Sequence, residues 1–128
     1  MPIVAEAGDI DDLDHVSNLV YVRWVLDVAM AHSRAKGWDH PQYRALGAVW
    51  VVRRHEIDYV LPVKLGEQLV AATWVEDWRA ASCIRKTEIA RDGQVVARGS
   101  TLWAFISFST GRPTPRRCRI VPFARTIR

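Results

Sequence analysis

The sequence predicts an α+β fold in which an antiparallel β-sheet wraps one long central α-helix. Three observations support this: one helical run is apolar over most of its circumference, a short apolar segment precedes it, and four segments rich in Val, Trp, Ile and Thr follow it. A helix with so wide an apolar surface must be covered on several sides, which a curled sheet can do. Several α+β folds share this order of elements.

The first half of the chain contains a short strand, an acidic loop and the long helix. The strand is expected over residues 3–6 and the helix over residues 19–36. Ser17 or Asn18 can serve as the N-cap of the helix, and Gly37 supplies its stop.

The second half is expected to form four sequential strands, because β-branched and aromatic residues dominate it and turn residues divide it. These strands are residues 48–61, 67–77, 82–91 and 95–108. Asp92-Gly93 is a strong signal for a hairpin turn between the last two. The segment between the helix and the first of these strands contains Pro41 and is expected to be a loop.

Length and composition are those of one domain, residues 1–128, with an irregular Arg- and Pro-rich tail over residues 110–128. With 49% hydrophobic residues and six tryptophans, the chain can bury a substantial core. No apolar run approaches the ~20 residues that span a bilayer, and the first residues lack a signal-peptide pattern, so we expect a soluble cytoplasmic protein. Cys83 and Cys118 show no CxxC spacing and are expected to be reduced and structural.

The net charge of +4 is unevenly distributed. The last nineteen residues contain no acidic residue but six arginines: Arg112, Arg116, Arg117, Arg119, Arg125 and Arg128. Such a tail can attract nucleic acid or the phosphates of a nucleotide-bearing substrate, or it can simply be solvated. Nucleic-acid binding is the weakest of these, because no aromatic-basic recognition motif accompanies the charge. We expect neither a nucleic-acid nor a membrane partner.

Several enzyme classes receive no support, because their motifs are missing. The sequence has no GxGxxG, phosphate-binding loop, HExxH or GxSxG motif. No motif places a histidine to activate Ser82, Ser107 or Ser109. We expect no metal and no cofactor.

The residues just before the long helix say most about chemistry. Residues 9–15 read Asp-Ile-Asp-Asp-Leu-Asp-His, so four carboxylates and a histidine precede the free N–H groups at the positive end of the helix. A carboxylate there can attack a carbonyl, or activate water against it, while backbone amides stabilise the oxygen. Taken alone, the pattern favours the alternative of a solvated acidic loop that only caps the helix.

This stretch resembles the DxDxxGHVNNxxYxxW signature of hotdog-fold acyl-CoA thioesterases, the family of 4-hydroxybenzoyl-CoA thioesterase. The matching residues are Asp9, Asp11, His15, Val16, Asn18, Tyr21 and Trp24, with Asp14 replacing a glycine and Ser17 an asparagine. Later segments also fall in family order, so the resemblance covers nearly the whole chain. It implies the hotdog fold and hydrolysis of an acyl-CoA thioester to the free acid and coenzyme A. It also favours a catalytic loop over a loop that only caps the helix.

The resemblance also implies roles for single residues. Asp11 corresponds to the catalytic carboxylate, as nucleophile or general base, and the backbone amide of Asn18 corresponds to the donor that polarises the thioester carbonyl. His15 is a candidate general acid, because histidine is the usual proton donor and acceptor in catalysis, although organising the loop is the favoured role. Asp14 replaces the family's glycine, and it is expected to affect the shape of the loop, because aspartate adopts a positive φ only at some cost.

Candidate substrate-binding residues are of two kinds. Tyr21, Tyr43 and Trp50 are candidates for the acyl site, while most tryptophans are assigned to core packing. Arg79, Arg85 and Arg112 are candidates for the coenzyme A phosphates, because they are expected in turns or at strand ends. Aromatic, medium-chain and branched acyl groups all suit such a pocket.

The carrier and the assembly leave alternatives. The acyl group can be carried by coenzyme A or by an acyl carrier protein, and a non-catalytic acyl-CoA-binding protein is also possible. Edge strands left open by the sheet predict a homodimer or homotetramer, with each site completed by the neighbour. Glu56 can serve a neighbour's site, although a surface ion pair with Arg53 or Arg54 is favoured.

Overall fold

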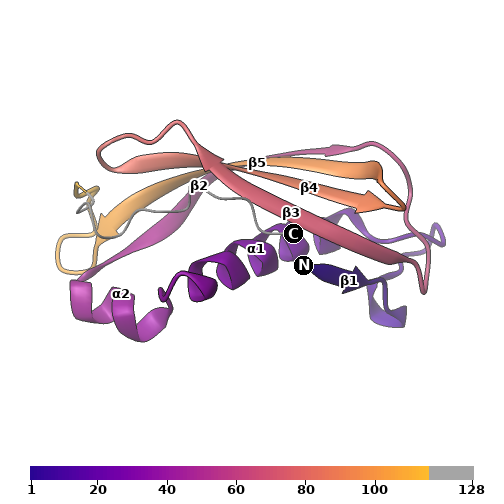
Figure 1. Cartoon of the computed structure of the whole chain (residues 1–128), viewed down its shortest axis with the longest axis horizontal. Coiled ribbons are helices and arrows are strands. Elements are labelled where there is room, and N and C mark those ends of the chain that lie inside the picture. The colour runs from indigo at the N-terminus through magenta and orange to yellow at the C-terminus, as the bar shows by residue number, and fades with distance from the viewer. Residues whose placement is uncertain (116–128) are drawn as a thin grey trace.

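The computed structural model describes residues 1–115 as a curled antiparallel sheet with a long helix against one face (Figure 1). In chain order the elements are β1 (Pro2–Val4), η1 (Ala7–Asp9), α1 (Asn18–Ala35), α2 (His40–Leu46), β2 (Ala48–Tyr59), β3 (Gln68–Glu76), β4 (Ser82–Arg91) and β5 (Gln94–Ser107). The predicted α+β class is confirmed. Cys118 and the predicted tail beyond residue 115 lie outside the described residues.

The strands lie in the order β1-β3-β4-β5-β2, and all neighbours are antiparallel. β1 is a short edge that pairs with β3, whereas β2 is a long edge whose described pairing is with β5 alone. The predicted hairpin between β4 and β5 is confirmed. Asp92 and Gly93 have φ values of 51° and 79°, as a type I′ turn requires.

α1 begins and ends within one residue of its predicted bounds. Ser17 is the N-cap, and its hydroxyl accepts a hydrogen bond of 3.3 Å from the N–H of Leu19. Gly37 follows the last turn with a φ of 85° and donates its N–H to the carbonyl of Arg34, as a glycine stop does.

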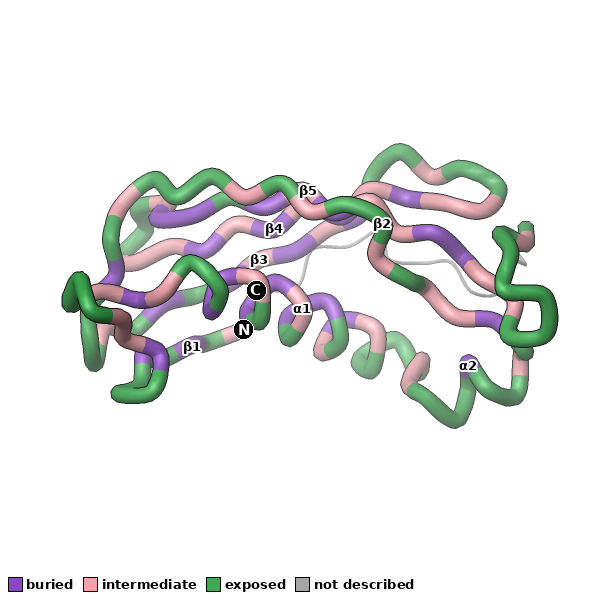
Figure 2. The backbone as a smooth tube through the Cα atoms, turned by 180° about the vertical axis from the view of Figure 1, so that it is seen from behind, coloured by how far each residue is buried: buried purple, intermediate pink, exposed green. Residues whose placement is uncertain are grey.

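Among residues 1–115, the sheet covers one side of α1 (Figure 2). Val20, Trp24 and Val28 are buried against the sheet, whereas Leu19 is 75% exposed and Met30 is 38% exposed. The expectation that the helix is buried over most of its circumference is therefore met only in part. The described residues leave part of its apolar surface uncovered.

The expectation of a loop around Pro41 is wrong, because α2 forms at this position. Its start is a capping box, in which the Asp39 carboxylate accepts from the N–H of His40 (2.9 Å) and the Gln42 side chain accepts from the N–H of Asp39 (3.0 Å). Pro41 lies in the first turn, where a missing N–H costs nothing. Gly47 ends the helix with a φ of 87°.

The core lies between α1 and the sheet. Side chains alternate along β3 and β4, so that every second residue points toward the helix and is buried. A second, aromatic cluster lies at the α2 end and contains Tyr43 and Phe105, with Trp38 and Trp50 packed against them. None of the helices in the described part of the chain is both long and apolar enough to cross a bilayer.

Candidate functional site

The acidic loop is fixed to α1 by Asp9. Its buried carboxylate accepts hydrogen bonds from the N–H of Glu6 (3.0 Å) and the guanidinium of Arg23 (2.7 Å), and its carbonyl accepts from the N–H of Ser17 (2.9 Å). Burial acts to raise the pKa of Asp9, but the Glu6 N–H and Arg23 outweigh it, so the pKa lies below its ordinary value. Asp9 therefore positions the loop rather than reacting.

Asp11 presents its carboxylate at the surface of the loop. One carboxylate oxygen, Oδ1, accepts a hydrogen bond from the N–H of Leu13 (2.9 Å), and Nδ1 of His15 lies 3.8 Å from the same oxygen. The side chain is 32% exposed. The carboxylate is thus oriented by the loop and remains accessible to water or a ligand.

The turn that carries Asp11 requires a positive φ at Asp14. The N–H of Asp14 donates to the carbonyl of Asp11 (3.1 Å), and the N–H of Asp11 donates to the carbonyl of His15 (3.0 Å). Asp14 has a φ of 63°, the left-handed conformation that glycine adopts without strain. The loop therefore forms this turn at the energetic cost expected for a positive φ at an aspartate.

The backbone N–H of Asn18 lies at the first position of α1. The next two amides, of Leu19 and Val20, donate to the side chain and carbonyl of Ser17, whereas no described residue accepts from the Asn18 N–H. The carbonyl of Asn18 accepts from the hydroxyl of Tyr59 (3.1 Å), which joins the end of β2 to the start of α1. An N–H at the positive end of a helix suits a developing oxyanion.

Two residues named as substrate-binding lie in the core. Tyr21 is 3% exposed and packs edge-on against Trp24 and Tyr59, so packing accounts for its position. The expected surface position of Arg85 is wrong, because Arg85 lies in the middle of β4, buried on the side that faces α1. A strand with period-two alternation, in which Arg85 shares its face with Cys83, was the available signal.

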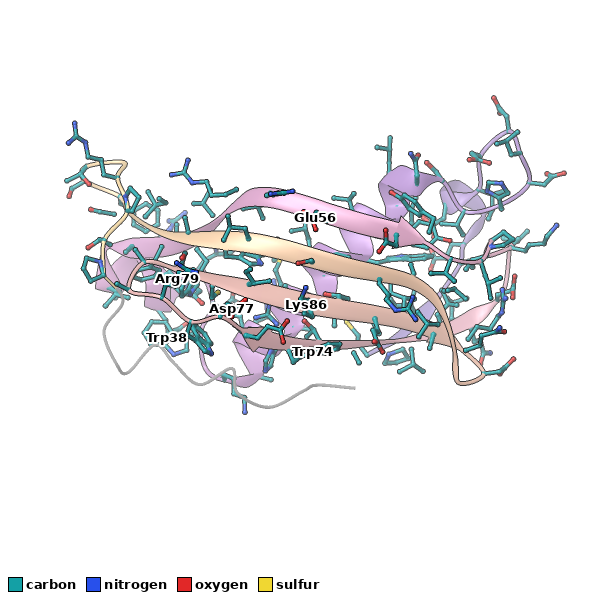
Figure 3. All side chains as sticks on the ribbon, turned by 90° about the horizontal axis from the view of Figure 1, so that it is seen from above. Trp38, Glu56, Trp74, Asp77, Arg79 and Lys86 are labelled. Atoms are coloured by element: carbon teal, nitrogen blue, oxygen red, sulfur yellow. The ribbon has the colours of Figure 1, made fainter. Side chains whose placement is uncertain are left out.

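The other named polar residues lie at the surface. Arg79 and Arg112 are exposed in the turns after β3 and β5, as expected. Figure 3 shows Arg79 beside the outer face of the sheet, which also carries Glu56. Glu56 forms an ion pair with Arg54, the arrangement that the sequence analysis favoured.

Tyr43 and Trp50 line a common cavity of about 220 Å³ at the C-terminal end of α1. We call it the aromatic cavity. Its wall is formed by the last turns of α1, by α2 and by the sheet, through these residues: Ala29, Met30, Ser33, Trp38, Asp39, His40, Tyr43, Val49, Trp50, Cys83, Arg85 and Trp103. Two of these residues were expected at the acyl site, but the cavity itself was not expected, because its wall combines residues of α1, β2, β4 and β5 with those at the start of α2.

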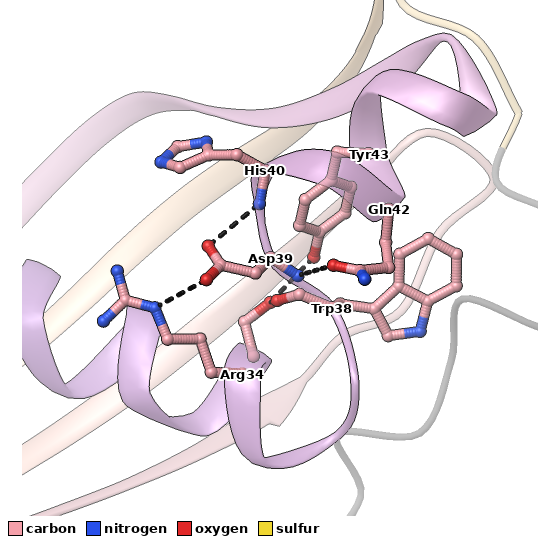
Figure 4. Close-up of polar contacts among 7 residues, drawn as sticks. Arg34, Trp38, Asp39, His40, Gln42 and Tyr43 are labelled. Atoms are coloured by element: carbon pink, nitrogen blue, oxygen red, sulfur yellow. Dashed lines mark hydrogen bonds and ion pairs between the residues drawn. The ribbon is translucent and has the colours of Figure 1, made fainter.

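Polar contacts hold α2 against α1 beside this cavity (Figure 4). The Ser33 hydroxyl donates to the carbonyl of Trp38 (2.7 Å) and lies 2.9 Å from the hydroxyl of Tyr43. Nε of Arg34 donates to the Asp39 carboxylate (3.1 Å). Burial raises the pKa of Tyr43, so its hydroxyl stays protonated at neutral pH.

Arg85 brings a positive charge to the wall of the aromatic cavity. Its Nη1 lies 2.9 Å from Nδ1 of His32 and donates to the hydroxyl of Thr73 (3.1 Å). Burial lowers the pKa of Arg85 to about 10, although Cys83 and Tyr43 oppose the shift. The guanidinium is therefore charged at neutral pH.

Asp11 and the aromatic cavity lie at opposite ends of α1. Asp11 precedes Asn18, whereas the cavity is lined by Ser33, fifteen residues further along the helix. At a rise of 1.5 Å per residue, Asn18 and Ser33 are about 22 Å apart along the helix axis. One chain therefore does not bring the predicted reacting group and the predicted acyl-site residues together.

A family model described as the thioesterase-like superfamily matches residues 5–123. No curated protein matches the chain. Several solved structures share its fold. A 1,4-dihydroxy-2-naphthoyl-CoA thioesterase from Synechocystis superposes with a TM-score of 0.84 at 15% identity, over 93% of this chain and 89% of that one.

Two further solved structures agree. A DHNA-CoA thioesterase from Staphylococcus aureus has a TM-score of 0.82 at 21% identity, over 90% of this chain and 78% of that one. YbaW, a probable thioesterase from Escherichia coli, has a TM-score of 0.81 at 21% identity, over 90% and 87%. At such identities the likeness shows the fold, and it confirms the predicted hotdog architecture.

Proposed function

Because the chain belongs to the thioesterase-like superfamily and has the hotdog fold, we propose that it is a thioester hydrolase that hydrolyses an acyl-CoA thioester through Asp11. The observation that carries this proposal is the position of Asp11. Its carboxylate is oriented by the Leu13 N–H and remains accessible, in the loop that leads to the Asn18 amide at the start of α1.

The chemistry follows one of two routes. As general base, Asp11 takes a proton from water, and the resulting hydroxide adds to the thioester carbonyl. As nucleophile, Asp11 adds itself and forms a mixed anhydride that water then hydrolyses. In both routes the Asn18 N–H stabilises the oxyanion, the C–S bond breaks, and the coenzyme A thiolate leaves and takes up a proton. His15, at 3.8 Å, keeps the Asp11 carboxylate oriented.

The proposal includes a homodimer, because the Asp11 loop and the aromatic cavity are separate in one chain. β2 is an edge strand of twelve residues, and the exposed side chains of Leu19 and Met30 lie on the side of α1 that residues 1–115 leave uncovered. If the β2 edges of two subunits pair across a twofold axis, neither β2 edge is left open.

Antiparallel pairing of two β2 edges brings the two parts of the site together. Within one chain, the end of β2 lies at the start of α1, because Tyr59 bonds to Asn18, and the start of β2 lies at the cavity, through Trp50. Pairing reverses the partner's strand, so the Asp11 loop of one subunit approaches the aromatic cavity of the other. Tyr43 and Trp50 then serve as acyl-pocket residues of the neighbour's site.

Exposed arginines complete the proposal. Arg79 and Arg112 can reach solvent-borne phosphates and are proposed to contact the nucleotide end of coenzyme A.

The protein's location in the cytoplasm stays a prediction.

The test is thiol release by the purified protein from a panel of aromatic, medium-chain and branched acyl-CoA esters. We expect free coenzyme A and free acid in equal amounts, with turnover for at least one ester. Tight binding of acyl-CoA without thiol release from any ester contradicts the proposal, and it supports a non-catalytic acyl-CoA-binding protein.

A further inference from the structure

Backbone hydrogen bonds fix the chain as it approaches the proposed oxyanion donor at the start of α1. The N–H of Val16 donates to the carbonyl of Val63 (2.8 Å), and the N–H of Ser17 donates to the carbonyl of Asp9 (2.9 Å). Both contacts precede Asn18 and are made by main-chain atoms. The entry into the helix is therefore held from two other segments of the chain.

The Tyr59 side chain fixes the peptide group that follows. Its hydroxyl donates to the carbonyl of Asn18 (3.1 Å). Tyr59 is the last residue of β2 and is itself held by the sheet, because it pairs with Ala97 of β5. Its ring packs edge-on against that of Tyr21, with ring centroids 5.2 Å apart. The hydroxyl therefore reaches the first residue of the helix from a fixed position.

Packing gives this first turn little support among the described residues. Asn18 is exposed, Leu19 is 75% exposed, and Val20 is the first residue of α1 to be buried. The first N–H groups of a helix lack partners within it, so a helix end frays unless other groups hold it. Hydrogen bonds rather than apolar contacts therefore set the orientation of the peptide groups on either side of Asn18.

An oxyanion donor depends on this orientation. A hydrogen bond weakens steeply as its N–H turns away from the acceptor, and a misplacement of about 1 Å can lower a rate by about a hundredfold. The Tyr59 proton is donated to the Asn18 carbonyl. The hydroxyl therefore acts on the residue that supplies the donor, and not on the reacting atoms.

We propose that Tyr59 is a positioning residue, whose hydroxyl holds Asn18 so that its N–H is aligned with the developing oxyanion. This inference rests on the proposed function and adds a residue of β2 to the same site. The N–H is needed most in the transition state, in which charge develops on the carbonyl oxygen. Loss of the Tyr59 hydroxyl therefore lowers the rate of the chemical step and leaves substrate binding nearly unchanged.

Tyr59→Phe tests this inference, because it keeps the ring and its contact with Tyr21 and removes only the hydroxyl. With the best ester of the panel, we expect the single-turnover rate of hydrolysis to fall by about three- to tenfold, the scale of one neutral hydrogen bond. KM should stay within about twofold of the wild-type value. Thr101→Val is the matched control: it removes the 3.0 Å hydrogen bond between Thr101 and His55, earlier in β2, and should leave the rate near that of the wild type.

A pair of variants of similar size isolates the hydrogen-bond donor at position 59. Replacing Tyr59 by 4-aminophenylalanine keeps an N–H donor, whereas replacing it by 4-methylphenylalanine puts a methyl group in the place of the hydroxyl. We expect the first variant to hydrolyse the ester at nearly the wild-type rate and the second to be as slow as Tyr59→Phe. Circular dichroism establishes that each variant is folded, and the pair decides the question even if Tyr59→Phe is unstable.

The outcomes separate this inference from the proposed function. Equal rates in folded variants with and without the donor overturn the inference and leave the proposed function in place. A loss of rate that 4-aminophenylalanine does not restore also overturns it, because packing rather than the donor is then responsible. If the wild type releases no thiol from any ester, the proposed function is wrong and the inference falls with it.

Discussion

Two aspartates that lie two positions apart in the acidic loop have opposite environments. Asp9 is buried and held by Arg23 and the Glu6 N–H, whereas Asp11 is oriented by the loop and accessible. The sequence shows that the loop is acidic, but burial decides which carboxylate is structural. The roles of these residues can therefore be separated by stability and by activity.

Asp9→Asn is expected to lower the free energy of unfolding by about 1 kcal/mol, because it removes the charged partner of Arg23. The effect is small because Arg23 is 56% exposed and solvent screens the pair. The pKa of Asp9 is lowered in the folded state, so its contribution is present above its unfolded pKa and is lost as pH falls through the folded pKa. Urea denaturation at pH 7 and pH 3 measures both effects, with exposed Asp12→Asn as the control. Equal losses at the two pH values would contradict this account of Asp9.

Asp14→Gly is expected to stabilise the protein by about 0.5–1 kcal/mol, because glycine adopts the positive φ at this position without strain. Urea denaturation at neutral pH measures the change. Asp12→Gly is the matched control: it lies in the same loop without a positive φ and should not stabilise. Destabilisation by Asp14→Gly would mean that the aspartate side chain itself supports the loop.

At the scale of elements, the sequence predicts what periodicity encodes. α1 and the four long strands are found within one or two residues of their predicted bounds, because an amphipathic period or a β-branched run extends over many residues. α2 was missed because its seven residues are too few for a period, and only the Asp39 capping box marks it. The aromatic cavity could not be predicted, because residues from five separate elements form it.

A pH effect on the β2–β5 pair belongs to this scale. His55 of β2 shares a hydrogen bond of 3.0 Å with the Thr101 hydroxyl of β5, and burial lowers the pKa of His55 below its ordinary 6.5. The unfolded chain therefore binds a proton more readily, so stability is lost as pH falls through about 6.5. His55→Gln is expected to reduce the drop in Tm between pH 7.5 and pH 5.5, whereas His40→Gln, at an exposed site, should not. An unchanged drop in His55→Gln would locate the acid sensitivity elsewhere.

At the scale of the whole molecule, the account requires two chains for one site. Asp11→Asn removes the reacting group, and Ala29→Phe fills the aromatic cavity of the same chain. If the site joins Asp11 of one subunit to the cavity of the other, a mixed dimer contains one intact site.

Mixing the two inactive variants in equal amounts, with subunit exchange, is expected to restore about one quarter of wild-type activity, because half of the dimers are mixed and each has one intact site of two. Thiol release measures the activity, and light scattering confirms the dimer. Each variant mixed with itself is the control. Absence of any recovery in a demonstrated mixed dimer would show that each site is complete within one chain.

The central claim is that the Asp11 carboxylate performs thioester hydrolysis, and replacing it by asparagine tests this most directly. Thiol release is measured for wild type, Asp11→Asn and Asp12→Asn with the best ester of the panel, after circular dichroism has shown that all three are folded. Asp11→Asn is expected to lower kcat by at least about a hundredfold, the scale of losing a general base, and Asp12→Asn to leave it near the wild-type value. Near-normal turnover by a folded Asp11→Asn protein would contradict the account.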